Sequence, residues 1–530
     1  MVTIGIDFGT LSARAVALDL DTGREIAHGE YVYPHGVMDR QLPDGTALPP
    51  QYALQHPRDY TEALSSVIRQ VLETVNKEDV VALGLDFTTS TALPVDEAGV
   101  PLCYQEKFAG DPHAYAKLWK HHGPVAQAQK FDRMAKERNE PWLVNCGGTV
   151  SSEWLFPKIL ETIEEAPEVF EATHRFYEAA DWLCLLMTGK EVHNPCMAGL
   201  KSCWDRQSGY PSRDYFRAVD PRLENVVGTK VSPIVNRVDE VVGTIHAEGA
   251  KLTGLLEGTK VAMPMGDCHA AMPALNVTKP DQALLVIGTS GVIMAHTAQK
   301  KEVPGICALT DGGVIPDVCT MEAGQAGLGD CFDWFVKQFG LDHKTLTEKA
   351  SCLRPGEKPL IALDWWNGNR SVLKNDNLSG LLLGMDLQTR PEEIYRALIE
   401  ATAYGLRVIV DNYEAHGVHI GDICVAGGIA MKNPMLMQIY ADVLNRTLTV
   451  GGSAQAGARG SALYAAVAAG VCEDITAAAE KYTLPTTAVY TPIPENVVVY
   501  DKLFEIYKEL HDYFGRENPV MDRLHQSFLA

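Results

Sequence analysis

Two Gly-Thr turns, far apart in the chain, contain the residue types that a phosphate-binding hairpin needs. The first turn is Gly9-Thr10 and the second is Gly288-Thr289, and a run of apolar residues precedes each of them. Glycine allows a backbone to approach a ligand closely and to adopt positive φ angles. Because one such hairpin lies in each half of the chain, the pattern predicts that a polyphosphate is held from two sides, and it indicates ATP chemistry.

The side chains around the first turn suit a nucleotide and a metal ion. Thr10 and Ser12 offer hydroxyl groups to phosphate oxygens, and Arg14 adds a forked positive charge. Asp7 ends the preceding strand, and Mg²⁺ prefers one or two carboxylates together with water. The alternative is that these residues form only a tight hairpin turn. The second turn makes nucleotide binding the better interpretation.

An aspartate in a glycine-flanked turn precedes the second hairpin. In Gly266-Asp267-Cys268-His269, a strand end delivers Asp267 to the start of a helix. We interpret Asp267 as a general base that takes the proton of a substrate hydroxyl attacking the γ-phosphorus, a role worth about 10² to 10⁴ in rate. The alternatives are that Asp267 only caps the helix and that His269 is the base. Asp267 is preferred because its turn lies close in sequence to the second hairpin and because phosphoryl transfer needs mainly positioning and charge compensation.

A double glycine, Gly427-Gly428, follows a further predicted strand, and a helix is expected to begin at Asn433. The bare glycine backbone offers a surface for a flat adenine or ribose. Asn433 followed by Pro434 is typical of a helix N-cap, and Asn433 is also a candidate nucleotide contact. The chain has no Gly-x-x-x-x-Gly-Lys-Ser/Thr motif, which excludes a Walker-type phosphate loop.

The elements that position these motifs alternate between strands and helices. Apolar periodicity predicts, in the first half, a helix at 59–76 capped by Asp59 and strands at 2–8, 12–20, 26–33 and 80–87. In the second half it predicts strands at 283–288, 292–296 and 423–426 and helices at 392–413, 434–445 and 503–514. Thr389 and Pro391 are expected to open the helix at 392–413.

The order of elements in the first half recurs in the second, which predicts two related domains. We place them at 1–262, with the substrate wall and the first hairpin, and at 263–530, with nucleotide binding. Residues 110–225 are rich in aromatic and polar side chains and are predicted to be an insertion that builds the substrate wall.

Composition narrows the function further. A chain of 530 residues is too long for one core. The formal net charge of −22 argues against a nucleic acid or an anionic membrane as partner. No apolar run approaches the roughly 18 residues of a membrane span, and Met1-Val2-Thr3 does not open a secretory signal. The 12 cysteines form no Cys-x-x-Cys pair. We therefore expect a cytoplasmic protein, and its oligomeric state is left open, a homodimer included.

The same motifs occur in this order in the FGGY carbohydrate kinases, which the chain resembles over essentially its whole length. They are Asp-Phe-Gly-Thr-x-Ser-x-Arg from Asp7, Gly-Asp-x-x-Ala-Ala from Gly266, Gly-Thr-Ser-Gly from Gly288 and Gly-Gly-x-x-x-x-Asn-Pro from Gly427. The resemblance implies an α/β fold of two ribonuclease-H-like domains, as in the actin and hexokinase superfamily, with ATP and sugar in a central cleft. It also implies ATP and Mg²⁺ as cofactors, Asp267 as the base, and Gly329 as a further nucleotide contact.

Within the family the chain is most similar to the L-ribulokinases, in the segments 33–39, 48–57, 86–91 and 194–201. This likeness implies a sugar pocket lined by Ala92, Lys201, Asp267 and Glu322, although Lys201 and Glu322 also have an interpretation as surface charges. The implied reaction transfers phosphate from ATP to L-ribulose, giving L-ribulose 5-phosphate in L-arabinose catabolism.

The loop that ends at Ala92 separates this prediction from its alternatives. It contains Thr-Ser-Thr-Ala, whereas glycerol kinases have Arg-Glu and xylulokinases have Met-His in that loop. Another sugar or polyol kinase of the family is the first alternative, and a chaperone-like ATPase is a more distant one. One departure is Lys432, where many relatives have Asn, and it bears on the adenine contact.

Overall fold

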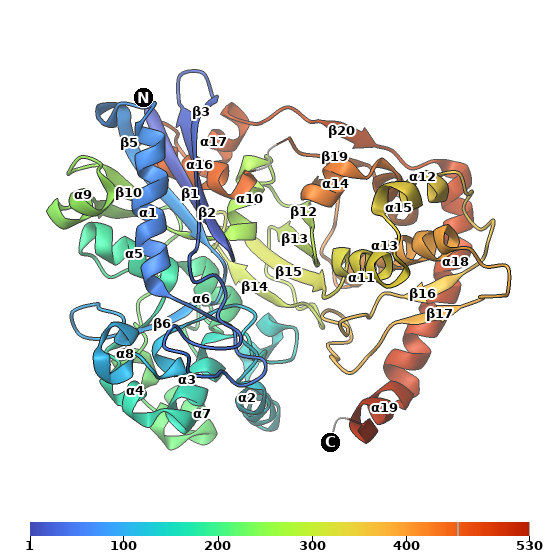
Figure 1. Ribbon diagram of the computed structural model, residues 1–530, viewed down its shortest axis with the longest axis horizontal. Coiled ribbons are helices and arrows are strands. Elements are labelled where there is room, and N and C mark those ends of the chain that lie inside the picture. The colour runs from blue at the N-terminus through green and yellow to red at the C-terminus, as the bar shows by residue number, and fades with distance from the viewer. Residues whose placement is uncertain (453–454, 529–530) are drawn as a thin grey trace. The chain divides into compact units, whose positions relative to one another are not determined.

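The computed structural model describes residues 1–452 and 455–528, which form two compact units (Figure 1). The first unit consists of Met1–Thr278, Ala308–Thr320 and Gln455–Thr483. The second consists of Lys279–Cys307, Met321–Ala454 and Leu484–Ala530. The chain thus returns twice to the first unit after Thr278. The division into domains at 1–262 and 263–530 assumes a single crossing and stays a prediction.

A mixed sheet forms the centre of the first unit. Its strands follow the order β3-β2-β1-β5-β10-β9, and β11 also pairs with β5. β1, β5, β10 and β11 run parallel, whereas β2 is antiparallel to β1 and β3 is antiparallel to β2. The bounds are β1 Val2–Phe8, β2 Ser12–Asp19, β3 Glu25–Val32, β5 Val80–Phe87, β9 Val241–Thr244, β10 Lys260–Ala262 and β11 Met265–Gly266. The strands predicted at 2–8 and 80–87 are confirmed to the residue.

Helices cover both faces of this sheet, and glycines allow them to approach it closely. α1 (Pro57–Leu72) lies against β2 and β3 (Figure 1), where a Cβ on Gly29 would lie 2.6 Å from the Val67 carbonyl oxygen. α16 (Ala456–Ala468) lies on the opposite face, against β1 and β5. A Cβ on Gly5 would lie 1.8 Å from the Ala458 oxygen, and one on Gly84 would lie 2.1 Å from the Ser461 oxygen. Any larger residue at Gly5 or Gly84 would push α16 off the sheet.

The start of α1 differs from the prediction. The helix begins at Pro57 and its N-cap is His56, whose ring nitrogen accepts a hydrogen bond from the Arg58 amide. Asp59 lies inside the first turn, and its carboxylate accepts from the backbone amide of His35 at 3.1 Å. The prediction of Asp59 as cap is therefore wrong, because Pro57, with its fixed φ, occupies the first helical position.

A second, antiparallel sheet of the first unit has the order β4-β7-β6-β8. Its strands are β4 Leu54–Gln55, β6 Ala92–Val95, β7 Ala116–Lys117 and β8 Arg175–Glu178. The remaining strand of this unit is β14, Ala308–Asp311. Its other helices are α2 Val125–Arg138, α3 Leu155–Glu165, α4 Pro167–Ala172, α5 Ala179–Thr188, α6 Pro195–Lys201, α7 Arg213–Val219, α8 Val226–Thr229, α9 Ala247–Thr253, α10 Asp267–Ala274 and α17 Ile475–Lys481.

The second unit repeats the arrangement of a hairpin followed by parallel strands. Its strand order is β15-β13-β12-β18-β19-β20, with β12, β18 and β19 parallel and β13 antiparallel to β12. The bounds are β12 Gln282–Ile287, β13 Gly291–Thr297, β15 Cys319–Gln325, β18 Asp422–Ala426, β19 Leu448–Val450 and β20 Ala488–Tyr490. A separate pair consists of β16 Ile361–Leu363 and β17 Leu381–Leu383.

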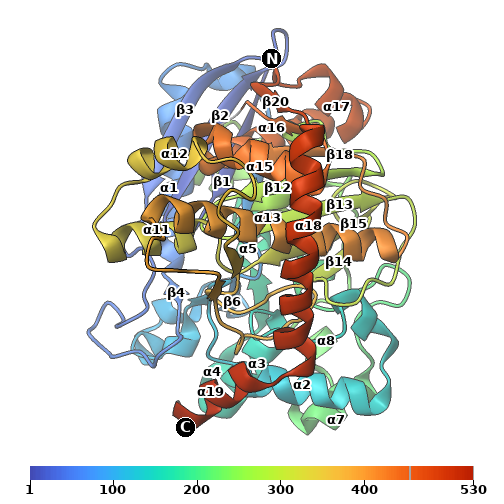
Figure 2. The same ribbon diagram turned by 90° about the vertical axis from the view of Figure 1, so that its right-hand side faces the viewer.

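The helices of the second unit include α18 (Pro494–Asp512), the long helix in front in Figure 2. It packs against α13 (Pro391–Ala415) and α15 (Pro434–Leu444), and Tyr500 of α18 accepts a hydrogen bond from Arg396 of α13 at 2.7 Å. The others are α11 Gly329–Phe339, α12 His343–Ser351, α14 Gly428–Lys432 and α19 Val520–Phe528. No described helix is both long enough and apolar enough to cross a bilayer.

Two helix starts in the second unit correct the predictions. α13 is capped by Arg390, which forms a capping box with Glu393, so Thr389 does not open the helix. α18 begins at Pro494, well before the predicted start at 503. Its first turns contain Val497, which belongs to a run of β-branched residues, and such a run lowers helix propensity when packing is not considered.

Candidate active site

Three parallel strands of the first unit, β1, β5 and β11, end at one edge of its sheet, and each delivers a carboxylate there. The register pairs Asp7 of β1 with Asp86 of β5, and Met265 of β11 with the same Asp86. Asp267 follows β11 directly and is the first residue of α10. The negative charges of Asp7 and Asp267 both raise the pKa of Asp86, which indicates that the three carboxyl groups lie near one another.

Asp7 and Asp86 are adjacent acids on neighbouring strands. Burial raises the pKa of both, and for Asp86 the charge of Asp7 raises it further. Ser461 of α16 donates a hydrogen bond to Asp86 at 2.6 Å. A Cβ on Gly457, in the first turn of α16, would lie 3.3 Å from both Asp7 Cγ and Asp86 Oδ1. The positive end of α16 therefore faces the two acids and favours negative charge there.

This pair fits a divalent cation such as Mg²⁺. Two adjacent carboxyl groups ionise together at a cost unless a positive charge lies beside them. Mg²⁺ is held by one or two carboxylates plus water and substrate phosphates rather than by a protein cage. Among residues 1–452 and 455–528, no group of three or more His, Cys, Asp or Glu side chains is arranged around a metal position. Asp7, which is only partly buried, is the member that a cation could reach.

The first hairpin already has partners for some of its predicted phosphate ligands. The Thr10 hydroxyl accepts a hydrogen bond from the Trp119 indole at 3.2 Å and keeps its own proton to donate. Gly9 closes the turn by donating to the Ser12 carbonyl at 3.0 Å. Arg14 lies opposite Asp7 in the β1–β2 ladder, and its guanidinium donates to Glu30 at 3.1 Å. Burial raises the pKa of Asp7, and the charge of Arg14 partly offsets that rise.

Asp267 and His269 lie in different surroundings, although both belong to α10. The N-cap of α10 is Gly266, so Asp267 is not the cap and stays partly exposed. One Asp267 oxygen accepts a hydrogen bond from the Cys268 amide at 2.8 Å. His269 is fully buried. Of the two, only Asp267 is accessible to a substrate hydroxyl.

Two of the predicted sugar-lining residues of the first unit, Ala92 and Lys201, are buried. Lys201 is the last residue of α6 and is 6% exposed, so its interpretation as a surface charge is wrong. Ala92 is the first residue of β6 and pairs with Glu178 of β8. Burial raises the pKa of Glu178, and the charge of Lys201 partly offsets that rise, which indicates that Lys201 lies near Glu178.

In the second unit, the hairpin at Gly288-Thr289 lies against the start of α11. Gly329 donates to the Gly288 carbonyl at 3.1 Å, and Leu328 donates to the Thr289 carbonyl at 2.9 Å. A Cβ on Gly329 would lie 2.5 Å from the Gly288 oxygen, so glycine is required for this approach. The structure thus brings together three of the predicted nucleotide contacts, Gly288, Thr289 and Gly329.

The double glycine ends β18 beside the same hairpin. Gly427 has φ 108°, and a Cβ there would lie 2.1 Å from the carbonyl oxygen of Ile287, the last residue of β12. Gly428 has no atom within 4 Å of a Cβ position, so its face is open. Asn433 caps α15 by accepting from the Leu436 amide at 3.0 Å, which confirms the predicted cap.

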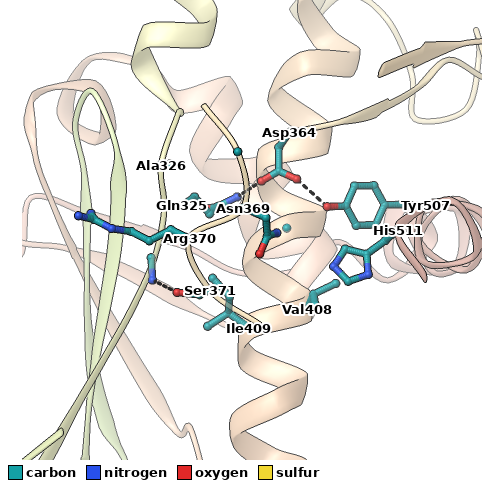
Figure 3. Close-up of a pocket in the computed structure, with 13 residues that line it drawn as sticks. Gln325, Ala326, Asp364, Asn369, Arg370, Ser371, Val408, Ile409, Tyr507 and His511 are labelled. Carbon is teal, nitrogen blue, oxygen red and sulfur yellow. Dashed lines mark hydrogen bonds between the residues drawn. The ribbon is translucent and has the colours of Figure 1, made fainter. Parts of the chain in front are cut away.

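Glu322 lies in β15 and is 8% exposed, so its interpretation as a surface charge is also wrong. A small pocket opens elsewhere in the second unit (Figure 3), and none of the predicted site residues lines it. There Asp364 accepts hydrogen bonds from Gln325 at 2.7 Å and from Tyr507 at 2.6 Å. The pocket is therefore lined by residues of α18 and its neighbours, and the turns at Gly288 and Gly427 do not contribute to it.

Asp86 is a carboxylate at this edge of the sheet to which the sequence analysis assigned no role, although a signal for it existed. Gly5-Ile6-Asp7-Phe8 in β1 recurs as Gly84-Leu85-Asp86-Phe87 in β5. The two glycines meet α16 and the rings of Phe8 and Phe87 stack with centroids 5.1 Å apart. The aspartates of the repeat end up side by side because the two strands are parallel neighbours in register.

Comparison with known proteins identifies the family. Residues 2–273 match the N-terminal domain of the FGGY family of carbohydrate kinases, and residues 283–469 match its C-terminal domain. The chain belongs to this family. The kinase is 45% identical to the ribulokinase of Bacillus licheniformis over 97% of each chain, and 45% identical to that of Geobacillus thermodenitrificans over 98% of this chain and 96% of the relative.

Solved structures agree on the fold of the kinase. It is similar to a xylulose kinase from Rhodospirillum rubrum, with a TM-score of 0.83 and 22% identity over 98% of this chain and all of the other. The predicted α/β fold of two domains of the actin and hexokinase kind is confirmed. Membership of the family makes this FGGY protein an ATP-dependent sugar kinase.

Proposed function

We propose that the kinase transfers the γ-phosphoryl group of ATP to the 5-hydroxyl of L-ribulose, giving ADP and L-ribulose 5-phosphate in L-arabinose catabolism. The observation that carries the choice of sugar is the 45% identity to proteins named ribulokinase over nearly the whole chain. The loop before Ala92, with Thr-Ser-Thr in place of the Met-His or Arg-Glu of other family members, supports the same choice. Because the reaction consumes ATP, we assign it to the cytoplasm.

In the proposed mechanism Asp267 is the general base. It is the accessible residue at the start of α10, and its carboxylate would accept the proton of the attacking hydroxyl. The Cys268 amide donates to one oxygen of Asp267 at 2.8 Å, which orients the carboxylate at the start of α10. Lys201 and Glu322 are both buried. Lys201 would donate hydrogen bonds to the remaining hydroxyl groups of the ketopentose, and Glu322 would accept hydrogen bonds from them.

The nucleotide would be bound by backbone and hydroxyl groups at the glycine turns. Thr10 and Ser12 in the first unit and Thr289 in the second would contact phosphate oxygens. Gly427 and Gly428 would receive the adenosine. Mg²⁺, when bound, would neutralise phosphate charge, and Asp7 is the residue that would hold it.

A substrate panel tests this proposal. ADP release is coupled to a spectroscopic readout, and kcat/KM is measured for L-ribulose, D-ribulose, D-xylulose, ribitol and glycerol. We expect L-ribulose to have the highest kcat/KM. An equal or higher value for D-xylulose or glycerol would refute the choice of sugar and leave the kinase assignment unchanged. ATP turnover that is independent of any sugar would favour a chaperone-like ATPase.

A further inference from the structure

The loop before Ala92 contains a residue in an unfavourable backbone conformation. The loop joins β5 to β6 and comprises residues 88–91. Ser90 has φ 64°, in the left-handed region that residues with a Cβ seldom occupy. A strained position of this kind persists only where surrounding contacts determine it. The contacts of Ser90 therefore indicate what the fold requires of this loop.

Lys158, in α3, reaches Ser90 through the interior of the first unit. Its ammonium group donates to the Ser90 carbonyl oxygen at 2.5 Å and to the Ser90 hydroxyl at 3.2 Å. The same group also donates to the Leu118 carbonyl at 3.0 Å, which fixes its position. The Ser90 hydroxyl in turn donates to the carbonyl oxygen of Glu153. Both polar groups of Ser90 are thus held by α3 or the residues just before it.

Glu178 holds the other end of the loop. One of its oxygens accepts a hydrogen bond from the Thr91 amide at 2.8 Å. The Ala179 amide donates to the Thr91 carbonyl at 3.0 Å, so Thr91 is tied to β8 and α5 on both sides of its backbone. Glu178 also pairs directly with Ala92 in the β6–β8 ladder.

Lys158 and Glu178 are buried charges that interact with each other. Burial lowers the pKa of Lys158 to about 7, and the charge of Glu178 opposes that shift. Burial likewise raises the pKa of Glu178 to about 7, opposed by the charge of Lys158. Glu153, Lys117 and Glu161 also act on Lys158. Burying two charges costs desolvation free energy, and a protein with apolar residues of similar volume in their place is often at least as stable. Stability alone therefore does not explain this pair.

The position of the pair supplies the explanation. Glu178 lies beside Ala92 in the sheet, and the charge of Lys201 acts on it. Ala92 and Lys201 are both predicted to line the sugar pocket. We propose that Lys158 and Glu178 are positioning residues that hold the 88–91 loop in one conformation and thereby set the affinity and selectivity for the sugar. The inference rests on the proposed function for the location of the pocket.

The decisive variants are Lys158→Met, alone and combined with Ser90→Gly. Methionine removes the donor while keeping a long unbranched chain. We expect Lys158→Met to raise the KM for the sugar about tenfold, by releasing Ser90 from its left-handed conformation, and to change the KM for ATP by less than about twofold. Glycine reaches positive φ without strain, so Ser90→Gly in the Lys158→Met background should restore much of the sugar KM. A purely structural role for Lys158 predicts no such restoration.

A second pair of variants keeps the inference testable where Lys158→Met does not fold. Glu178→Gln retains an oxygen that accepts from the Thr91 amide, whereas Glu178→Met does not. We expect the methionine variant to raise the sugar KM and the glutamine variant to stay close to the wild-type value. Equal KM values for the two would overturn the role of Glu178.

The matched control removes a buried ion pair of the second unit. Arg396 donates to Glu400 at 2.7 Å within α13. The double variant Arg396→Met/Glu400→Gln should lower Tm without changing the ratio of sugar KM to ATP KM. The inference is overturned if the control raises the sugar KM as much as Lys158→Met, or if Lys158→Met lowers Tm and leaves the sugar KM unchanged. All variants are assayed with whichever acceptor the wild type phosphorylates best, so a wrong choice of sugar does not affect this test.

Discussion

Replacing Asp267 with asparagine removes the proposed base with little other change. Asn has the same size, and its side-chain oxygen can still accept from the Cys268 amide, which lies 2.8 Å from Asp267 Oδ1. Asp267 is partly exposed, so the free energy of unfolding should change by no more than about 0.5 kcal/mol. The negative charge near Asp86 disappears, which should lower the pKa of Asp86 slightly.

The expected kinetic effect follows from the loss of proton acceptance alone. A positioned general base is worth about 10² to 10⁴ in rate, which corresponds to about 2.7 to 5.4 kcal/mol in the activation free energy. We expect kcat of Asp267→Asn to fall by that factor. The dissociation constant of the sugar should stay within about threefold, since the amide still offers an oxygen to the hydroxyl.

The assay is coupled ADP release for kcat and isothermal titration calorimetry for sugar binding. Asp214→Asn is the control, because Asp214 also lies in the first turn of a short helix, α7, and forms an exposed ion pair with Arg217. It should leave kcat unchanged. A kcat for Asp267→Asn within tenfold of wild type would remove Asp267 from the role of base.

Three further predictions concern the nucleotide turns and the acid pair. Thr289→Val should raise the KM for ATP about tenfold by removing one hydroxyl from a charged phosphate, whereas a change confined to the sugar KM would contradict the hairpin assignment. Gly427→Ala should lower the free energy of unfolding by about 2 kcal/mol or more in chemical denaturation, because residue 427 has φ 108° and the new Cβ would lie 2.1 Å from the Ile287 oxygen. The control Gly428→Ala has open space at its Cβ and should not destabilise the protein. Equal losses of stability in the two variants would refute this reasoning. Burial raises the pKa of Asp86 above its value in the unfolded chain. The contribution of Asp86 to stability is therefore present at low pH and is lost as pH rises toward the folded pKa. Tm should fall less between pH 5 and 8 in Asp86→Asn than in the wild type, and parallel curves of Tm against pH would show that Asp86 is ionised in the folded protein.

Local sequence patterns were sufficient to predict the strands and helices that contain most of the proposed site. β1 and β5 could be predicted to the residue because each is a largely apolar run that ends in Asp-Phe. The caps of α1 and α13 could not, because capping depends on which backbone amides remain unbonded. In α1 the helix begins at Pro57, upstream of Asp59. Asp59 has a side chain that can cap a helix, but it lies inside the first turn.

The partners of the site residues required the folded structure. Lys201 and Glu322 are charged residues that have two interpretations in sequence, and only packing reveals that both are buried. Asp86 could have been identified from the sequence, since its Gly-x-Asp-Phe context repeats that of Asp7. Lys158 and Glu178 could not have been identified in this way, because each lies more than 60 residues from the loop that it contacts and no local spacing connects them to it.

The most direct test of the proposed function is to identify the product formed from L-ribulose and ATP. Incubation with Mg²⁺, followed by ³¹P and ¹³C NMR of the sugar product, determines both the acceptor and the oxygen that is phosphorylated. We expect one equivalent of ADP for each equivalent of a single product, with the phosphate coupled to C5. A phosphate on another carbon, or ADP release without a phosphorylated pentulose, would contradict the proposed reaction.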